Sequence, residues 1–262
     1  MTWWNIYRQG LLVGIADLRQ FWTLRSWFFA WLVRVLTNAF AWVLLGRVAG
    51  SEDKVHYLLV GHAVAAGASA ALWASNATTW SRWDGTHPLL VIAPGSLLAA
   101  VIGRTSVWLL NGMATSLMSF IVLFAAFGVV PQPSAALASL GVVLLVCTSA
   151  FGFALWTGAW LSNRGRFRNI ALDLSSMILV AICGVSVPVE FWPRPVQWIA
   201  NAIPMTHGLA AIRLILGHGA HGSIAWQIAL EVAVASGWLL LSLLTMTRLF
   251  NGGRADGSIE LV

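Results

Sequence analysis

The chain has 262 residues, of which 59% are hydrophobic and only 9% are charged. A water-soluble domain has about a quarter of its residues charged, so this composition excludes a soluble globular protein. The net charge of +6 resembles that of nucleic-acid-binding proteins, but the basic residues lie in short loops between apolar stretches. That placement is typical of membrane proteins, and we expect a lipid bilayer and no nucleic acid as surroundings.

Six apolar stretches follow one another along the chain. About 20 residues of helix cross the hydrocarbon core of a bilayer, and each stretch reaches this length or nearly so. The predicted spans are Trp27–Leu45, Tyr57–Trp80, Ser96–Val130, Ala135–Leu161, Ile170–Val187 and Ala225–Phe250. The sequence therefore predicts an all-α polytopic membrane protein with six transmembrane helices in a single domain over residues 1–262.

The basic residues fall in alternate loops. With a cytoplasmic N-terminus, eleven of the 15 Lys and Arg lie on the cytoplasmic side and four on the outer side. Because positive residues concentrate in cytoplasmic loops, we expect both termini in the cytoplasm, with residues 251–262 as a cytoplasmic tail. The preference for Arg over Lys, with abundant Ala, Gly and Trp, indicates a GC-rich bacterial genome and hence the bacterial plasma membrane.

Residues 1–26 precede the first span and have an amphipathic pattern. Apolar side chains recur at helical spacing, with Arg, Gln and Asp between them; they are Trp4, Leu11, Ile15, Leu18 and Trp22. This pattern predicts a helix that lies in the membrane interface. The alternative is an ordinary leader to the first of the spans in residues 27–186.

Residues 187–223 are too apolar for a loop and too interrupted for a span. Pro188, Pro193, Pro195 and Pro204 divide the segment, because proline cannot continue a helix. We expect two short helices, at Pro195–Ile203 and Thr206–Leu216, that re-enter the outer leaflet before the last span, which occupies residues 224–250. Irregular backbone at membrane depth must pack in protein or line a cavity.

Three charged residues lie in or near this segment. Glu190, Arg213 and Glu231 are predicted to form an external gate closed by ion pairs, because charges are costly in lipid unless they are paired. The alternative is a structural tie that holds the re-entrant helices.

Most of the 16 tryptophans lie near span ends, as expected for an interfacial belt. Trp73, Trp108 and Trp238 fall deeper and are candidates for lining a transport pathway; the alternative is contact with the core or with lipid. No nucleotide-binding loop and no His or Cys cluster occurs in the sequence. We therefore assign no catalytic residue, no metal ligand and no cofactor to this chain.

Two motifs, with the order of the elements around them, carry a resemblance. The cytoplasmic loop after the second span reads Arg82, Trp83, Asp84, Gly85, Thr86, His87, Pro88, Leu89 and Leu90, followed by Pro94. Before the last span come Pro188, Pro193 and Pro195, then Ile203-Pro204-Met205-Thr206, Ala210-Ala211 and Arg213. Over its whole length the chain resembles the permease subunit of type-2 ABC exporters.

This resemblance implies that a separate cytosolic ATPase drives transport. Two copies of the ATPase would bind ATP and Mg²⁺, and two copies of the permease, expected as a homodimer, would form the pathway. The loop Arg82–Leu90 would enter a cleft of the ATPase as a coupling helix. Trp83 and Leu89 would be its buried anchors, with Arg82 and Asp84 at the rim. The alternative is a plain intracellular loop.

The resemblance also implies a class of substrate. Trp-rich spans favour an amphipathic small molecule, such as a drug, an antibiotic or another natural product. A lipid-linked glycan or cell-envelope precursor is the alternative cargo. A membrane-embedded enzyme and a membrane scaffold are remote alternatives, because the nine acidic residues are scattered over both sides.

Overall fold

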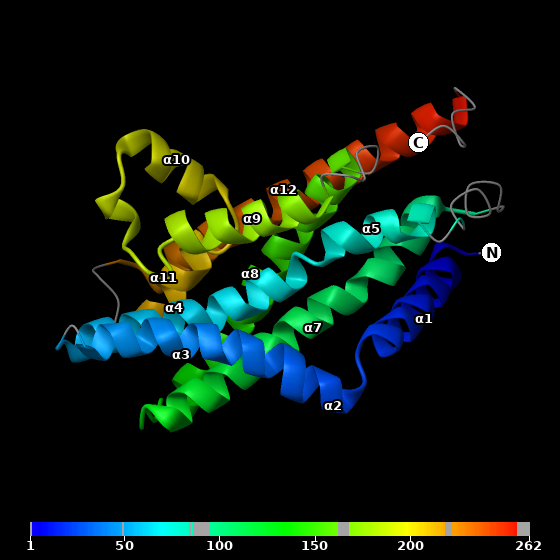
Figure 1. The fold of residues 1–262 in the computed structure, drawn as a ribbon. Helices are drawn as coiled ribbons and strands as arrows, with labels where there is room; N and C mark the ends of the chain where they lie inside the picture. Colours follow the sequence, from blue (N-terminus) through cyan, green and yellow to red (C-terminus); the bar gives the residue numbers. More distant parts are fainter. Residues whose placement is uncertain are drawn as a thin grey trace.

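The protein is described by a computed structural model that covers residues 2–48, 50–83, 85, 95–161, 168–217 and 222–255. All regular structure in these residues is helical (Figure 1). The long helices are α3 (Val33–Val48), α4 (Glu52–Ala71), α7 (Leu97–Ala126), α8 (Pro133–Leu161) and α12 (Ile224–Ala255). The shorter ones are α1 (Trp3–Phe21), α2 (Leu24–Ser26), α5 (Ala74–Trp83), α9 (Arg168–Ile182), α10 (Arg194–Ala202) and α11 (Thr206–Ile215).

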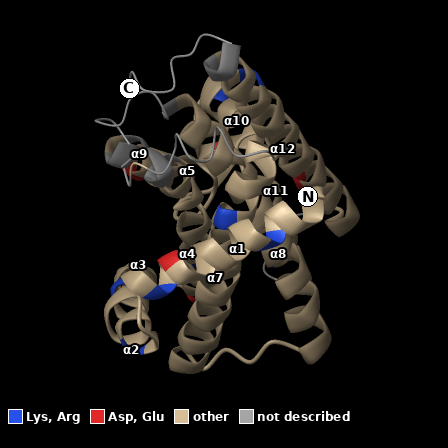
Figure 2. Ribbon diagram, turned by 90° about the vertical axis from the view of Figure 1, so that its right-hand side faces the viewer, with Lys and Arg blue, Asp and Glu red and all other residues tan. Residues whose placement is uncertain are grey.

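Five helical stretches are long and apolar enough to cross a membrane, which supports a membrane-spanning protein. They are Leu24–Val48, Glu52–Thr78, Leu97–Ala126, Pro133–Trp160 and Ile224–Gly252. The first joins α2 and α3 through a π-helical turn at Trp27–Leu32. Uncharged residues dominate these helices in Figure 2, and blue and red are confined to short stretches.

The sixth predicted span is not confirmed. Helix α9 ends at Ile182, and the backbone is irregular from Cys183 to Val187, where Gly184 has a φ of +83°. At 1.5 Å per residue, its 15 residues measure about 23 Å, less than the hydrocarbon core of about 30 Å. The start of α1 and the end of α12 nevertheless lie at the same end of the bundle in Figure 1, with α10 and α11 at the other.

Helix α4 is the centre of the bundle. It contacts α3, α7, α8 and α11, and most of its span is enclosed, whereas most of α12 is exposed. Small residues allow the close approach of α4 and α7: a Cβ on Gly67 or on Gly112 would lie 2.7 Å from the other residue's carbonyl oxygen. The hydroxyl of Ser116 donates to the carbonyl of Ala63 across the same contact, at 3.0 Å.

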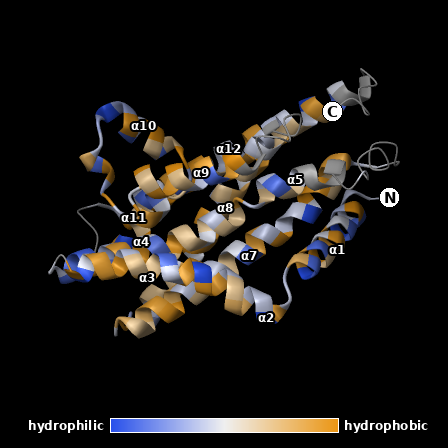
Figure 3. Cartoon of the chain, viewed as in Figure 1, coloured by the Kyte–Doolittle hydropathy of each residue, from blue (hydrophilic) through white to orange (hydrophobic). Residues whose placement is uncertain are grey.

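Helix α1 confirms the predicted amphipathic N-terminal helix. Hydrophobic and hydrophilic residues mix along it in Figure 3, and its inner side lies on α7. Gly10 and Gly14 of α1 meet the backbone of α7 at Ala100 and Arg104, so a Cβ on either glycine would overlap a carbonyl group. The packing thus ties α1 to the start of α7.

The two short helices predicted before the last span are present as α10 and α11. Pro193 and Pro195 begin α10, and Pro204 lies between α10 and α11. A 3₁₀ turn, Val189–Phe191, precedes them. Helix α10 exposes Trp198 (72%) and Ile199 (54%), so these two apolar side chains are left uncovered by the part of the chain that the structure describes.

Candidate functional site

Arg213 fastens the last turn of α11 to the centre of the bundle. Its side chain is only 7% exposed. Its Nη2 donates to the carbonyl of Tyr57 at 3.1 Å and to that of Val185 at 3.3 Å. The guanidinium carbon lies 3.4 Å from the centre of the Tyr57 ring, a cation–π contact. The positive charge is therefore held by backbone carbonyls and an aromatic ring.

The lack of a side chain at Gly61 makes this approach possible. A Cβ at that position would overlap the carbonyl oxygen of Val185 and lie 3.0 Å from Nη2 of Arg213. The irregular backbone after α9 supplies the Val185 carbonyl, and α4 supplies that of Tyr57. The Tyr57 hydroxyl donates to Gly184 at 2.8 Å, and His62 is bonded to Ser186 at 3.2 Å. Tyr57 and His62 of α4 thus both bond the irregular segment that follows α9. The bond from Tyr57 satisfies a backbone carbonyl there, as a buried carbonyl outside a helix requires.

Glu231 of α12 fastens the other end of α11. It is fully buried, and its two oxygens accept from the amides of Met205, at 3.2 Å, and Gly208, at 2.9 Å. Met205 precedes the first residue of α11 and has a φ of +89°. The first amides of a helix have no partner within it and favour a negative charge, so the carboxylate caps α11 from the neighbouring helix.

The ion pairs predicted for the gate are not formed. Arg213 belongs to the last turn of α11, whereas Glu231 bonds the first turn of that helix. The two turns are about 10 Å apart along the helix axis. Glu190 lies exposed in the 3₁₀ turn and has no ion pair with Arg213. The structure instead shows two sets of contacts that hold α11 in place. Arg213 with Tyr57 holds its C-terminal end, and Glu231 holds its N-terminal end. Hereafter we call these three residues the α11 clasp.

The three pathway candidates separate into two clusters. Trp73 stacks on Trp108 with 5.6 Å between ring centres, and Trp31 meets Trp73 edge-on at 5.8 Å. Trp108 is only 2% exposed, so this cluster is part of the core between α4 and α7. Trp238 lies elsewhere: it contacts Phe153 and Trp156 of α8, and its indole NH donates to the carbonyl of Ala202 at 2.9 Å.

The coupling loop lies largely outside the described residues. Arg82 and Trp83 are the last residues of α5, but their side chains are not described; Gly85 is described and exposed. Asp84, Thr86, His87 and Leu89 are outside the described ranges. The end of α5 and the start of α7, which flank the loop in the sequence, lie at the same end of the bundle as the start of α1 (Figure 1).

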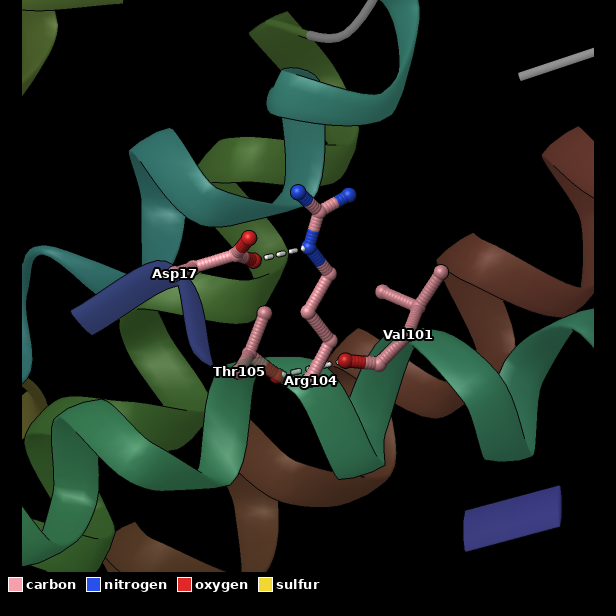
Figure 4. A network of polar contacts seen from close by, with 4 residues as sticks. All are labelled: Asp17, Val101, Arg104 and Thr105. Carbon is pink, nitrogen blue, oxygen red and sulfur yellow. Dashed lines mark hydrogen bonds and ion pairs between the residues drawn. The ribbon is translucent and has the colours of Figure 1, made fainter. Parts of the chain in front are cut away.

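An ion pair that the sequence did not indicate joins α1 to α7. Nε of Arg104 donates to the Asp17 carboxylate at 2.6 Å (Figure 4), and both side chains are mostly buried. Helical spacing alone could not identify this pair, because 87 residues separate the two.

No three His, Cys, Asp or Glu residues in the described ranges lie close enough together to hold a metal ion. The two cysteines, Cys147 and Cys183, are buried and unpaired as disulfides. No protein-family model and no curated protein matches the sequence of this chain.

Proposed function

We propose that the chain is the membrane permease of an ATP-driven exporter with the plan of type-2 ABC exporters. It moves an amphipathic small molecule, such as a drug, an antibiotic or another natural product, outward across a bacterial plasma membrane. One observation carries the proposal: α11 is a short helix held inside one end of a bundle of apolar spans by the α11 clasp. In this proposal α11 lies at membrane depth, where an element that does not span must pack in protein or line a cavity, and it serves there as the gate.

In this proposal the segment Ile170–Val187 completes a sixth crossing, with its last residues unwound. Helices α10 and α11 re-enter from the outer side, so that Trp198 and Ile199 contact lipid. Both termini lie in the cytoplasm. The start of α1 and the end of α12 lie at one end of the bundle, with α10 and α11 at the other, which supports a shared side for the two termini (Figure 1). The excess of Lys and Arg in the loops of that side supports the cytoplasm.

The work comes from a partner ATPase that binds at the cytoplasmic end. The loop Arg82–Leu90 couples the two subunits, and α7 begins shortly after it. Because α1 is packed on α7 and ion-paired to it, a displacement of the loop is passed to α1 and α7 together. Two permease copies and two ATPases form the transporter.

The coupling role is tested by replacing Trp83 with Ala in a membrane preparation that contains the chain and its ATPase. We expect weaker association of the ATPase, because loss of a buried aromatic anchor at an interface costs about 2 kcal/mol or more. Trp226→Ala is the matched control: Trp226 is exposed in the first turn of α12, at the opposite end of the bundle. If Trp83→Ala and Trp226→Ala bind the ATPase equally well, Trp83 is not an anchor.

A further inference from the structure

Two polar side chains are exposed at the middle of the first membrane span. The span is Leu24–Val48, and Arg34 and Asn38 lie two residues before and two residues after its middle residue, Leu36. They are one turn apart and are therefore neighbours on one side of α3, with Thr37, which is also exposed, between them. This side of the span is polar at the depth where a bilayer consists of hydrocarbon.

The rest of the chain does not satisfy these two side chains. Neither Arg34 nor Asn38 has an ion pair or a side-chain hydrogen bond with another described residue. The guanidinium carbon of Arg34 lies 5.1 Å from the centre of the Trp31 ring, a cation–π contact. That ring is fixed, because it is 6% exposed and its indole NH donates to Oγ1 of Thr115 at 3.4 Å. A charge at the bilayer centre costs about 2.5–3.5 kcal/mol or more, so Arg34 requires a partner from outside the chain.

Lipid headgroups are too far away to be this partner. Arg34 and Asn38 are each about 3 Å from the centre of the span, and so about 12 Å from either edge of a hydrocarbon core about 30 Å thick. Long basic side chains reach the headgroups from positions near helix ends, not from the middle of a span. The side of α3 that carries the pair therefore faces protein or water rather than lipid.

The carboxylates of a second copy are also poorly placed. Most of the described ones are engaged or lie at span ends: Asp17 is bonded to Arg104, Glu231 caps α11, Glu52 and Asp53 begin α4, and Glu190 is in the 3₁₀ turn. Asp173 is exposed and has no ion pair among the described residues, so it is the rival partner. It lies about 5 Å from the start of the crossing Ile170–Val187. A two-fold axis along the membrane normal keeps every residue at its own depth, so Asp173 of a second copy would lie nearer the surface than Arg34.

We propose that the Arg34–Asn38 pair binds the acidic group of the transported molecule, so that the cargo of the exporter is an anionic amphiphile. The guanidinium of Arg34 donates to a carboxylate, sulfate or phosphate oxygen, and the side-chain amide of Asn38 donates a second bond. Trp31 holds the guanidinium in position for the acid. Ionised residues within membrane spans commonly mark substrate pathways. The inference rests on the proposed transport function and adds the charge of the cargo to it.

Binding is measured on the purified chain in phosphatidylcholine nanodiscs, so that the measurement does not need the ATPase. Two fluorescent probes of equal length are compared, a coumarin-labelled alkyl carboxylate and its primary carboxamide. The wild type should bind the carboxylate more tightly. Arg34→Gln should weaken carboxylate binding about 10- to 100-fold, the loss expected for a hydrogen bond to a charged group, and leave carboxamide binding unchanged. Equal carboxylate binding in wild type and Arg34→Gln would overturn the proposal, as would an equal loss with both probes.

Three further variants separate the pair from other causes. Arg47→Gln makes the same change in the exposed last turn of α3 and should leave both affinities unchanged. Asn38→Ala should weaken carboxylate binding about two- to tenfold, which provides a second measurement if Arg34→Gln fails to fold. Asp173→Asn should change neither binding nor the association of copies. If Asp173→Asn and Arg34→Gln both dissociate the copies, the partner of Arg34 is a carboxylate of a second copy and the proposal is wrong.

Transport distinguishes this inference from the proposed function. In proteoliposomes that contain the ATPase, Arg34→Gln should slow ATP-dependent export of the carboxylate probe by a similar factor. Export of that probe at the same rate in wild type and Arg34→Gln would refute the inference and leave the transport function standing. Binding of the carboxylate through Arg34 without export of either probe would refute the transport function and leave an acid-binding pair.

Discussion

Replacing Glu231 with Gln tests the cap that α12 places on α11. In the native protein the two carboxylate oxygens accept from Met205 and Gly208. Gln retains one oxygen, and its NH₂ group would face an amide donor. A hydrogen bond to a charged group contributes about 1.5–3 kcal/mol, and a negative charge at a helix N-terminus up to about 2 kcal/mol. Because the neutral Gln is easier to bury, we expect a net loss of about 2–3 kcal/mol.

The loss is measured as hydrogen exchange of the α11 amides in lipid nanodiscs. A cost of about 2–3 kcal/mol corresponds to opening about 30- to 150-fold more often. The same substitution at Glu190, which is exposed, provides the control and should change stability by less than about 0.5 kcal/mol. If α11 exchanges equally in Glu231→Gln and Glu190→Gln, the carboxylate does not hold the helix and the clasp is misassigned.

Three further predictions follow from contacts in the structure. Arg213→Lys should cost about 2 kcal/mol and so lower the melting temperature by about 4–8 °C, because Lys cannot stack on Tyr57 while bonding both carbonyls; an unchanged melting temperature would contradict this. Gly14→Ala should destabilise the protein by about 1–3 kcal/mol in a denaturation assay, because its Cβ overlaps the Arg104 carbonyl; Gly141→Ala, which meets open space, should not. Trp198→Cys should resist a membrane-impermeant thiol reagent added from outside, whereas Ala220→Cys should react; equal labelling would show that α10 lies in water and does not enter the membrane.

Apolar length and proline spacing were enough to predict the helices. The long spans were predicted from runs of hydrophobic residues, and α10 and α11 from Pro193, Pro195 and Pro204 between short apolar pieces. The end of α9 was not predicted, because Cys183–Val187 is as apolar as a span. Only the three-dimensional structure shows that its carbonyls are needed by Tyr57 and Arg213.

The partners of buried charges could not be predicted from the sequence. Arg213 and Glu231 were singled out as costly in a membrane, and each was assigned a charged partner. Backbone groups bond both instead: the carbonyls of Tyr57 in α4 and Val185 in the irregular segment for Arg213, and helix-terminal amides for Glu231. The sequence does not reveal partners of this kind, because every residue except proline has both a backbone N–H and a backbone C=O, whatever its side chain. The Asp17–Arg104 pair was missed for a related reason, since it depends on how α1 packs across α7.

The central claim, that a separate ATPase drives export through this chain, is tested most directly by reconstitution. The chain and the ABC ATPase produced with it in its own cells are placed together in proteoliposomes, and ATP-dependent movement of a fluorescent amphipathic dye is followed. The account predicts dye movement and ATP hydrolysis that both require the two proteins together and both fall in Trp83→Ala. An ATPase that neither binds the chain nor is stimulated by it would contradict the account, as would turnover of a lipid substrate by the purified chain alone.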